Sequence, residues 1–212
     1  MNNLSGYDAV TQGVAFYELP GAGFLSISGD DRVRFLQRQT TNDIELLAPD
    51  RVIPTVLTSS TARILDVFYL VYEPKAIDVV PLPGHAQETA HYLKSRIFFM
   101  DRVGVADLSA DYTQILLEGP ATADLLHRLG FTEVPALNQL VMGSIAEQPA
   151  RAFGRAGLAD SGYHLVAPIS AGQALADTLK LNYITLGQPY DCPMTNQVET
   201  CSPKDFKPPG FL

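Results

Sequence analysis

Cysteine, tryptophan and basic charge are all scarce in this chain of 212 residues. Tryptophan is absent, and the two cysteines, Cys192 and Cys201, both lie near the C-terminal end. Two cysteines are too few for a disulfide framework or a four-cysteine zinc site. We therefore interpret them as isolated thiols in a protein of the reducing cytoplasm, and we predict no metal site.

Acidic residues outnumber basic ones, since 23 Asp and Glu face 15 Lys and Arg, a net charge of −8 at pH 7. Nucleic-acid binding depends on neutralising phosphates, so this balance argues against DNA or RNA as a general partner. Long apolar runs are missing too, because the longest, residues 67–72, has only the length of a strand. Residues 1–10 have no basic flank and no apolar segment, so we predict neither a secretory signal nor a membrane partner.

The residues that are present suffice for a folded core. Hydrophobic residues make up 46% of the chain and charged residues 18%, the opposite of the balance found in disordered proteins. The length suits one large domain or two small subdomains. Strand-like segments follow one another directly and helix-like segments interrupt them irregularly, which is typical of an α+β fold.

Hydrophobic periodicity and turn residues place the elements along the chain. We expect strands at residues 14–19, 24–28, 52–58, 64–72, 76–82, 103–108, 112–117, 139–147, 151–153 and 163–168. We expect helices that begin at residue 32 and at residues 86–100, 121–129 and 171–181. The Pro-Gly-Ala-Gly turn at residues 20–23 makes the first two strands a hairpin-like pair.

Polar residues flank the helix that begins at Arg32. Asp30 or Asp31 is expected to accept the free backbone N–H groups of its first turn. Asn42 and Asp43 follow the helix, and their side chains compete for backbone hydrogen bonds. The residues alone leave open whether Asn42 and Asp43 only close the helix or also contribute to a site.

Asp66 stands out chemically because it interrupts the apolar strand at residues 64–72. A buried carboxylate must be hydrogen-bonded or paired, since bare burial costs several kcal/mol. In an extended strand Asp66 shares a face with Ile64 and Phe68. The alternative is an outward-facing residue beside Arg63 at the start of the strand.

Familiar catalytic signatures are missing from the sequence. There is no nucleophile-elbow serine motif, phosphate-binding loop, zinc-protease helix or dinucleotide glycine fingerprint. The histidines are scattered, and for each we favour an ordinary surface or helix role over metal binding: His85, His91, His127 and His164.

Five blocks of sequence nevertheless form an ordered set. They are residues 29–44 (GDDRVRFLQRQTTNDI), 64–66 (ILD), 92–109 (YLKSRIFFMDRVGVADLS), 117–121 (LEGPA) and 161–165 (SGYHL). In this order and spacing they resemble the folate-binding domain shared by the glycine-cleavage T-protein, an aminomethyltransferase, and the YgfZ-type iron–sulfur maintenance proteins.

This resemblance implies an α+β fold of two interleaved subdomains of mostly antiparallel sheet with helices, around a central folate cavity. The folate-binding domain would take residues 10–190, with residues 50–112 as an inserted subdomain. Residues 191–212 would form an irregular tail. The C-terminal barrel domain that usually follows in the family would be absent from this chain.

The resemblance also implies tetrahydrofolate, or a one-carbon derivative of it, as the ligand. Asp66 matches the carboxylate that orients folate for methylene transfer in the T-protein, which gives it a catalytic and folate-binding role. Asn42, Tyr163 and His164 are the other predicted folate contacts. A carboxylate suits a reduced pterin, because one carboxylate can accept two adjacent N–H donors.

The chain departs from both branches of the family. Val67 replaces the second of the paired acids of the T-protein, and the hallmark cysteine motif of the YgfZ-type branch has no counterpart. Residues 37–44 and 93–109 nevertheless resemble the YgfZ-type branch, so we expect a tetrahydrofolate-binding protein of the YgfZ type that serves iron–sulfur cluster assembly or repair. Two alternatives stay open, so enzymatic activity is undecided: a folate-dependent aminomethyltransferase, and a non-catalytic module that binds a protein partner on a retired enzyme scaffold.

Overall fold

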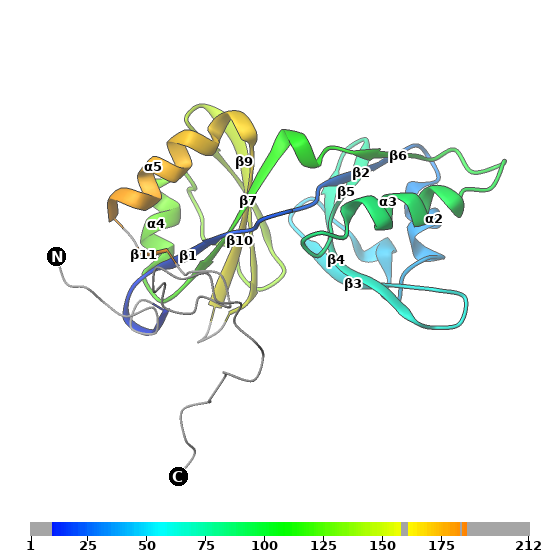
Figure 1. Cartoon of the computed structure of the whole chain (residues 1–212), viewed down its shortest axis with the longest axis horizontal. Coiled ribbons are helices and arrows are strands. Elements are labelled where there is room, and N and C mark those ends of the chain that lie inside the picture. Colours follow the sequence, from blue (N-terminus) through cyan, green and yellow to red (C-terminus); the bar gives the residue numbers. More distant parts are fainter. Residues whose placement is uncertain (1–9, 158–160, 183, 186–212) are drawn as a thin grey trace, which may run out of the picture.

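The computed structural model describes residues 10–157, 161–182 and 184–185 of the chain. Its strands form two sheets that lie side by side, each accompanied by its own helices (Figure 1). Nearly all neighbouring strands run antiparallel, the exception being the β1–β11 pair. The predicted α+β fold with two subdomains of mostly antiparallel sheet is confirmed.

The first sheet has six strands in the order β11-β1-β7-β10-β9-β8. They are β1 (Ala15–Glu18), β7 (Tyr112–Glu118), β8 (Leu140–Ile145), β9 (Gln148–Ala156), β10 (Ser161–Pro168) and β11 (Ile184–Thr185). Helices α4 (Thr122–Arg128) and α5 (Gly172–Asn182) share a buried core with this sheet through Leu125, Leu126, Leu175 and Leu179. The short helix η3 (Ile169–Ala171) leads into α5.

The second sheet has five strands in the order β3-β4-β5-β2-β6. They are β2 (Leu25–Ser28), β3 (Val52–Thr58), β4 (Ile64–Glu73), β5 (Ala76–Val80) and β6 (Gly104–Asp107). Helices α2 (Arg32–Gln37) and α3 (Ala86–Ser95) pack on it through Phe35, Leu36 and Leu93. Two short helices, η1 (Ile44–Leu46) and η2 (Ser109–Asp111), complete the elements of this half of the molecule.

Strands β1 and β2 lie in different sheets, so the predicted hairpin-like pairing between them is wrong. β1 pairs with β7, whereas β2 is inserted between β5 and β6. The crossing segment is held by hydrogen bonds to β7: Leu19 donates to the Gln114 carbonyl at 3.1 Å, and the Gln114 amide donates to the Gly23 carbonyl at 2.7 Å. The second sheet therefore begins at Leu25. We expected the inserted subdomain to start further along the chain, at residue 50.

Aromatic side chains join the two sheets. A buried cluster takes residues from both of them: Phe24, Val52, Val71, Val80, Leu140, Phe153 and Val166. Tyr69 of β4 contacts Phe153 of β9 with ring centroids 4.9 Å apart. Phe24 stacks on Tyr112 at 4.1 Å. The two halves of the chain consequently share one apolar interface.

Arg151 adds charge to this interface. It comes from β9, and its guanidinium pairs with Asp78 of β5 at 2.6 Å and with Glu73 of β4 at 2.7 Å. The same guanidinium lies 5.6 Å from the centre of the Phe24 ring. The three charged side chains are mostly buried, at 15% exposure for Arg151, 6% for Asp78 and 30% for Glu73, so each depends on the others for its counter-charge.

The ends of two helices differ from the prediction. α3 ends at Ser95 rather than residue 100: the N–H groups of Arg96 and Ile97 already bond to carbonyls three residues back, and residues 98–101 form a separate tight turn closed by the Asp101 N–H donating to the Phe98 carbonyl at 2.9 Å. Asp31 sits at the start of α2, but its carboxylate makes no capping bond. It accepts the backbone N–H of Arg102 at 3.0 Å instead, and this bond lowers the pKa of Asp31 below its ordinary range.

Asp30 is likewise drawn away from the helix, since it pairs with the Arg102 guanidinium at 2.9 Å. The predicted capping role of Asp30 or Asp31 is therefore wrong, and both acids hold the loop before β6 against the start of α2. Within the described residues, no helix combines the length and the apolar character needed to cross a membrane.

We predict that Gly29→Ala destabilises the fold strongly. Gly29 has a φ of +101°, and an added Cβ would lie 2.0 Å from the Arg102 carbonyl oxygen. The conformational strain and the collision together should cost roughly 2–4 kcal/mol, measured as the free energy of unfolding in urea. Gly84→Ala is the matched control, because its φ is +81° and nothing lies within 4 Å of its Cβ. Equal losses in the two variants would contradict the close approach at Gly29.

We predict that Arg151→Met destabilises the joint between the two sheets by about 3 kcal/mol, because it leaves two largely buried carboxylates without their counter-charge. Arg102→Met is the control, since that side chain is 70% exposed and its ion pairs are screened by water. Thermal and urea unfolding of both variants would test this. A loss for Arg151→Met no larger than that for Arg102→Met would show that the interfacial ion pairs do not hold the sheets together.

Candidate functional site

Asp66 is buried in the second sheet, with only 1% of its surface exposed. It lies on β4 opposite Leu57 of β3 and on the same face as Phe68. One carboxylate oxygen accepts the backbone N–H groups of Val67 at 2.8 Å and Leu82 at 3.3 Å. The other accepts the Thr89 hydroxyl of α3 at 2.5 Å. The outward-facing alternative for Asp66 is therefore wrong, and three donors compensate the buried charge.

A pocket of about 640 Å³ opens between α3 and the ends of β3 and β4. Its volume is in the range that holds small-molecule ligands. The lining residues are Leu57, Leu65, Gln87, Glu88, Thr89, His91, Tyr92 and Ser95. Thr89 belongs to this lining and also bonds Asp66, so the buried carboxylate supports the pocket wall from behind.

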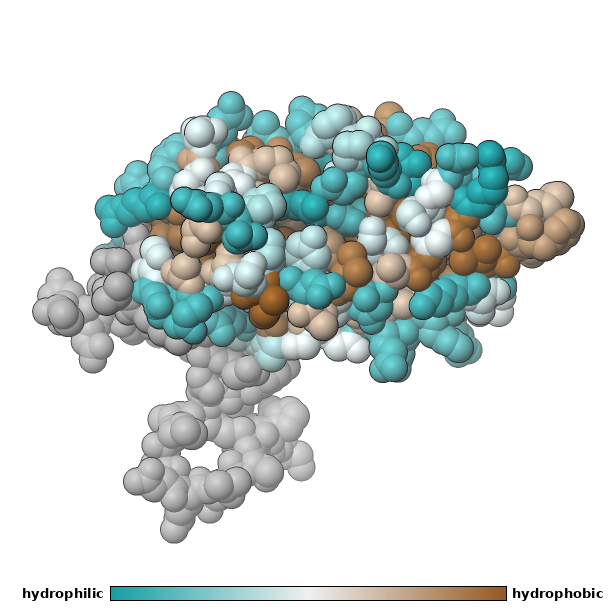
Figure 2. All heavy atoms as spheres, turned by 90° about the horizontal axis from the view of Figure 1, so that it is seen from above, coloured by the Kyte–Doolittle hydropathy of each residue, from teal (hydrophilic) through white to brown (hydrophobic). Residues whose placement is uncertain are grey.

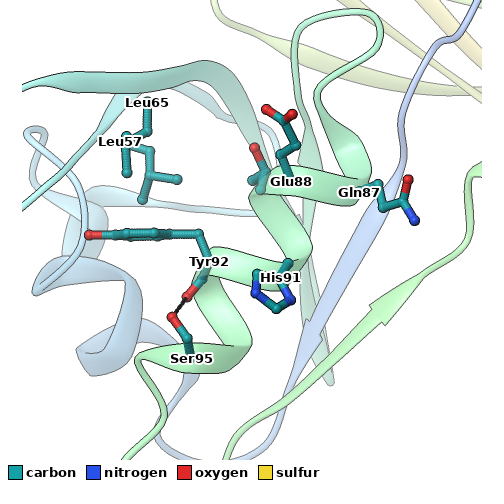
Figure 3. Close-up of a pocket in the computed structure, with 8 residues that line it drawn as sticks. Leu57, Leu65, Gln87, Glu88, His91, Tyr92 and Ser95 are labelled. Atoms are coloured by element: carbon teal, nitrogen blue, oxygen red, sulfur yellow. Dashed lines mark hydrogen bonds between the residues drawn. The ribbon is translucent and has the colours of Figure 1, made fainter.

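The side chains around the pocket separate into an apolar and a polar part. In Figure 3 the Tyr92 ring lies flat beneath Leu57 and Leu65, on the side of the strands. Glu88, Gln87 and His91 lie along the exposed side of α3. The pocket thus offers a flat apolar surface next to a carboxylate.

A cation adjoins the aromatic wall. The Tyr92 hydroxyl donates to the Thr58 carbonyl at 3.2 Å, which fixes the ring. Arg96, one turn further along the chain, donates to the Tyr92 hydroxyl at 3.0 Å, and its guanidinium carbon lies 4.9 Å from the ring centre. This pairing keeps a positive charge beside the pocket.

The other predicted site residues do not line this pocket. Asn42 is exposed, and its backbone N–H donates to the Thr55 hydroxyl at 3.2 Å. Tyr163 and His164 lie on β10 in the first sheet and are 8% and 5% exposed. The structure brings Asp66 together with the pocket through Thr89, and it does not bring Asn42, Tyr163 or His164 to the same place.

His164 is part of the buried joint between the sheets. Its ring stacks on Phe153 at 4.8 Å, and its Nε2 is 2.8 Å from the side-chain oxygen of Gln114. Burial, with a smaller contribution from the charge of Arg155, lowers the pKa of His164 to about 3. The imidazole is therefore neutral at physiological pH, and Nε2 carries the proton donated to Gln114.

Sequence reasoning missed the polar face of α3. Glu88, Tyr92 and Ser95 follow one another at i, i+4 and i+7, which places them on one side of a helix. That spacing was visible beside the apolar stripe of the same helix. It could have identified the lining, but the residues that face it across the pocket come from strands distant in sequence.

The described residues contain no group of three or more His, Cys, Asp or Glu side chains placed to hold a metal ion. Cys192 and Cys201 lie outside the described residues.

Known proteins share both sequence and fold with this chain. The sequence model of the family described as the GCVT N-terminal domain matches residues 4–191. A chloroplastic protein of Arabidopsis thaliana, whose name gives it as a transferase, is 30% identical over 133 residues, which are 63% of this chain and 31% of that protein. An aminomethyltransferase of Mycobacterium avium is 22% identical over 177 residues, 83% of this chain and 48% of that protein.

The chain thus spans between about a third and a half of the length of these curated relatives. The crystal structure of glycine cleavage system aminomethyltransferase T from Bartonella henselae superposes with a TM-score of 0.66 at 21% identity, over 78% of this chain and 45% of that protein. At this identity the likeness shows a shared fold. Since the family match takes in residues 4–191, the predicted resemblance is confirmed, and the chain belongs to the family of the GCVT N-terminal domain, the aminomethyltransferase-type domain.

Proposed function

We propose that this chain binds tetrahydrofolate, or a one-carbon derivative of it, in the pocket between α3 and the ends of β3 and β4. The observation that carries the proposal is the composition of that pocket. A flat apolar wall, an exposed carboxylate and a cation surround it, and the buried Asp66 fixes one of its hydroxyl groups.

The apolar wall suits the flat ring system of a reduced pterin. Tyr92 presents an aromatic face, and Leu57 and Leu65 lie opposite it (Figure 3). Flat heterocycles gain from burial against aromatic and aliphatic side chains. The hydrogen bond from Tyr92 to Thr58 holds the ring in place before the ligand arrives, which lowers the ordering cost of binding.

The polar wall suits the N–H donors of the pterin. The exposed carboxylate of Glu88 can accept two adjacent N–H groups at once. The Thr89 hydroxyl donates its proton to the Asp66 carboxylate. The Thr89 oxygen can therefore only accept a hydrogen bond from a ligand. In this proposal Asp66 orients folate through Thr89, as a positioning residue.

The glutamate tail of folate is anionic and requires basic groups in an otherwise acidic protein. Arg96 lies over the Tyr92 ring, and Lys94 on the same helix is exposed. Both could pair with tail carboxylates that leave the pocket. Asn42, Tyr163 and His164 lie outside this pocket, so their proposed role as folate contacts rests on the family resemblance alone.

We further propose that folate binding serves iron–sulfur cluster assembly or repair, in the manner of the YgfZ-type branch. Residues 29–44 and 92–109 support this branch by resemblance. Aminomethyl transfer is the second candidate, supported by the names of the aminomethyltransferase relatives. Val67 weighs against turnover, because it occupies the place of the second acid. The remaining acid, Asp66, already accepts hydrogen bonds from Val67, Leu82 and Thr89 of the same chain.

We predict that isothermal titration with 5-formyltetrahydrofolate gives micromolar binding that weakens at least tenfold in Tyr92→Ala and in Glu88→Gln. A tenfold change corresponds to about 1.4 kcal/mol, which is reasonable for one stacking ring or one charged acceptor pair. Glu133→Gln is the control, since Glu133 is also exposed and does not line the pocket. Unchanged affinity in both pocket variants would remove folate from this site. Failure of the wild type to bind would favour the interaction-module alternative.

We predict that the purified chain, supplied with the other proteins of glycine cleavage and with tetrahydrofolate, shows no methylene transfer above background. The reason is that Val67 replaces the second of the paired acids, and the carboxylate of Asp66 already accepts three hydrogen bonds from within the chain. Val67→Asp restores an acid at the second place of the pair. Methylene transfer by this variant would show that the missing acid is what prevents turnover. Turnover by the wild type that disappears in Thr89→Val would instead establish the aminomethyltransferase function.

A further inference from the structure

A second cavity, of about 430 Å³, opens at the joint between the two sheets. Its lining comes from β2, from the turn between β4 and β5, from β5 itself, and from β7 and β9. It shares no residue with the pocket at α3. Its volume is in the range that holds a small-molecule ligand, so the chemistry of its lining indicates which ligand would fit.

One buried carboxylate of this lining is only half satisfied. The side chain of Asp78 on β5 is 6% exposed, and its Oδ2 accepts the Arg151 guanidinium at 2.6 Å. Its other oxygen, Oδ1, meets no hydrogen-bond donor among the residues that the structure describes. A buried carboxylate oxygen without a donor is costly. Because Asp78 lines the cavity, a ligand that brings an N–H group would give Oδ1 the donor that it lacks.

The charges around Asp78 favour a cationic donor at this place. Asp78 and Glu73 share one guanidinium, that of Arg151, at 2.6 Å and 2.7 Å. These three mostly buried side chains therefore carry one net negative charge. A further positive group beside them would complete the counter-charge that buried acids require. An ammonium group of a ligand has both the charge and the N–H donors.

An exposed lysine of the same lining carries the opposite charge. Lys75 lies in the turn between β4 and β5 and borders the cavity. It forms no ion pair with any residue that the structure describes. Two acids and two bases thus line the cavity, with one acid deeply buried and this lysine exposed. A simple cation or anion would disturb that balance, whereas a ligand with one charge of each sign preserves it.

The rest of the lining is mainly apolar. Phe24 and Tyr112 both line the cavity, and their rings stack with centroids 4.1 Å apart. Leu108 and Pro74 belong to the same lining. Figure 2 shows hydrophilic and apolar side chains mixed over most of one face of the molecule, so an aromatic and aliphatic wall beside four charged groups is a distinct feature. Such a wall gains from contact with an apolar part of a ligand.

We propose that this cavity binds an α-amino acid with an apolar side chain. Such a molecule combines an ammonium group, a carboxylate and an apolar group, which are the three complements of the lining. The ammonium group donates to Oδ1 of Asp78, and the carboxylate pairs with Lys75. The side chain of the ligand covers Phe24 and Tyr112. This site does not depend on folate binding, because the cavity and the pocket at α3 have no lining residue in common.

The test is isothermal titration of the full chain with L-phenylalanine and with L-leucine. We expect at least one of them to bind. We also expect its two analogues with a single charge to bind at least tenfold more weakly, because each loses one charged contact. For L-phenylalanine these analogues are phenethylamine and 3-phenylpropionate. For L-leucine they are 3-methylbutylamine and 4-methylpentanoate.

Two variants assign the ends of the ligand. Lys75→Gln should weaken binding of the amino acid at least tenfold and leave binding of the amine analogue unchanged. Asp78→Asn should weaken binding of both the amino acid and the amine. Urea unfolding shows whether Asp78→Asn, which removes a partner of Arg151, still folds. If it does not, Lys75→Gln decides, because that side chain is exposed in a turn.

Lys94→Gln is the matched control, because Lys94 is also exposed and lies outside the lining of this cavity. It should leave amino-acid binding unchanged. The proposal is overturned if neither amino acid binds, or if an analogue with one charge binds as tightly as the amino acid. It is equally overturned if Lys75→Gln, or a folded Asp78→Asn, binds the amino acid like the wild type.

Discussion

The hydrogen bonds of one buried carboxylate organise the half of the molecule that contains the second sheet. Asp66 sits at 1% exposure on β4 and accepts donors from its own strand, from Leu82 and from Thr89 of α3. A charge in that position is tolerated only when it is fully hydrogen-bonded. The carboxylate therefore ties α3 to the sheet at Thr89, beside the apolar contacts of Ala86, Ala90 and Leu93, and the pocket opens between these elements.

The second constraint is the exchange of strands between the halves. β2 leaves the neighbourhood of β1, enters the second sheet between β5 and β6, and the chain returns to the first sheet as β7. Neither sheet is complete without this crossing. The shared apolar cluster and the Arg151 ion pairs then make the two sheets one body, so the pocket at α3 rests on a scaffold that local unfolding of one half would disturb.

Charge is distributed unevenly on this scaffold. The chain is acidic overall, with a net charge of −8, yet Arg34, Arg38, Arg96 and Arg102 gather around α2, α3 and the turn before β6. Most of them are held by aromatic rings or carboxylates in fixed positions. Three aspartates lie among these arginines, since Asp101 pairs with Arg38 and both Asp30 and Asp31 pair with Arg102, so most of this positive charge is compensated locally.

Periodicity and composition by themselves determined the class of fold, the position of most strands and helices, and the unusual chemistry of Asp66. These are local properties, since the alternation of side chains and the cost of a buried charge act within a few residues. Ordered motif blocks also sufficed to identify the family. The pairing of β1 with β7, the turn of Asp31 toward Arg102 and the meeting of Thr89 with Asp66 were decided only by the tertiary structure. Each joins residues distant in sequence, and no local pattern specifies which distant donor or strand edge satisfies a given group.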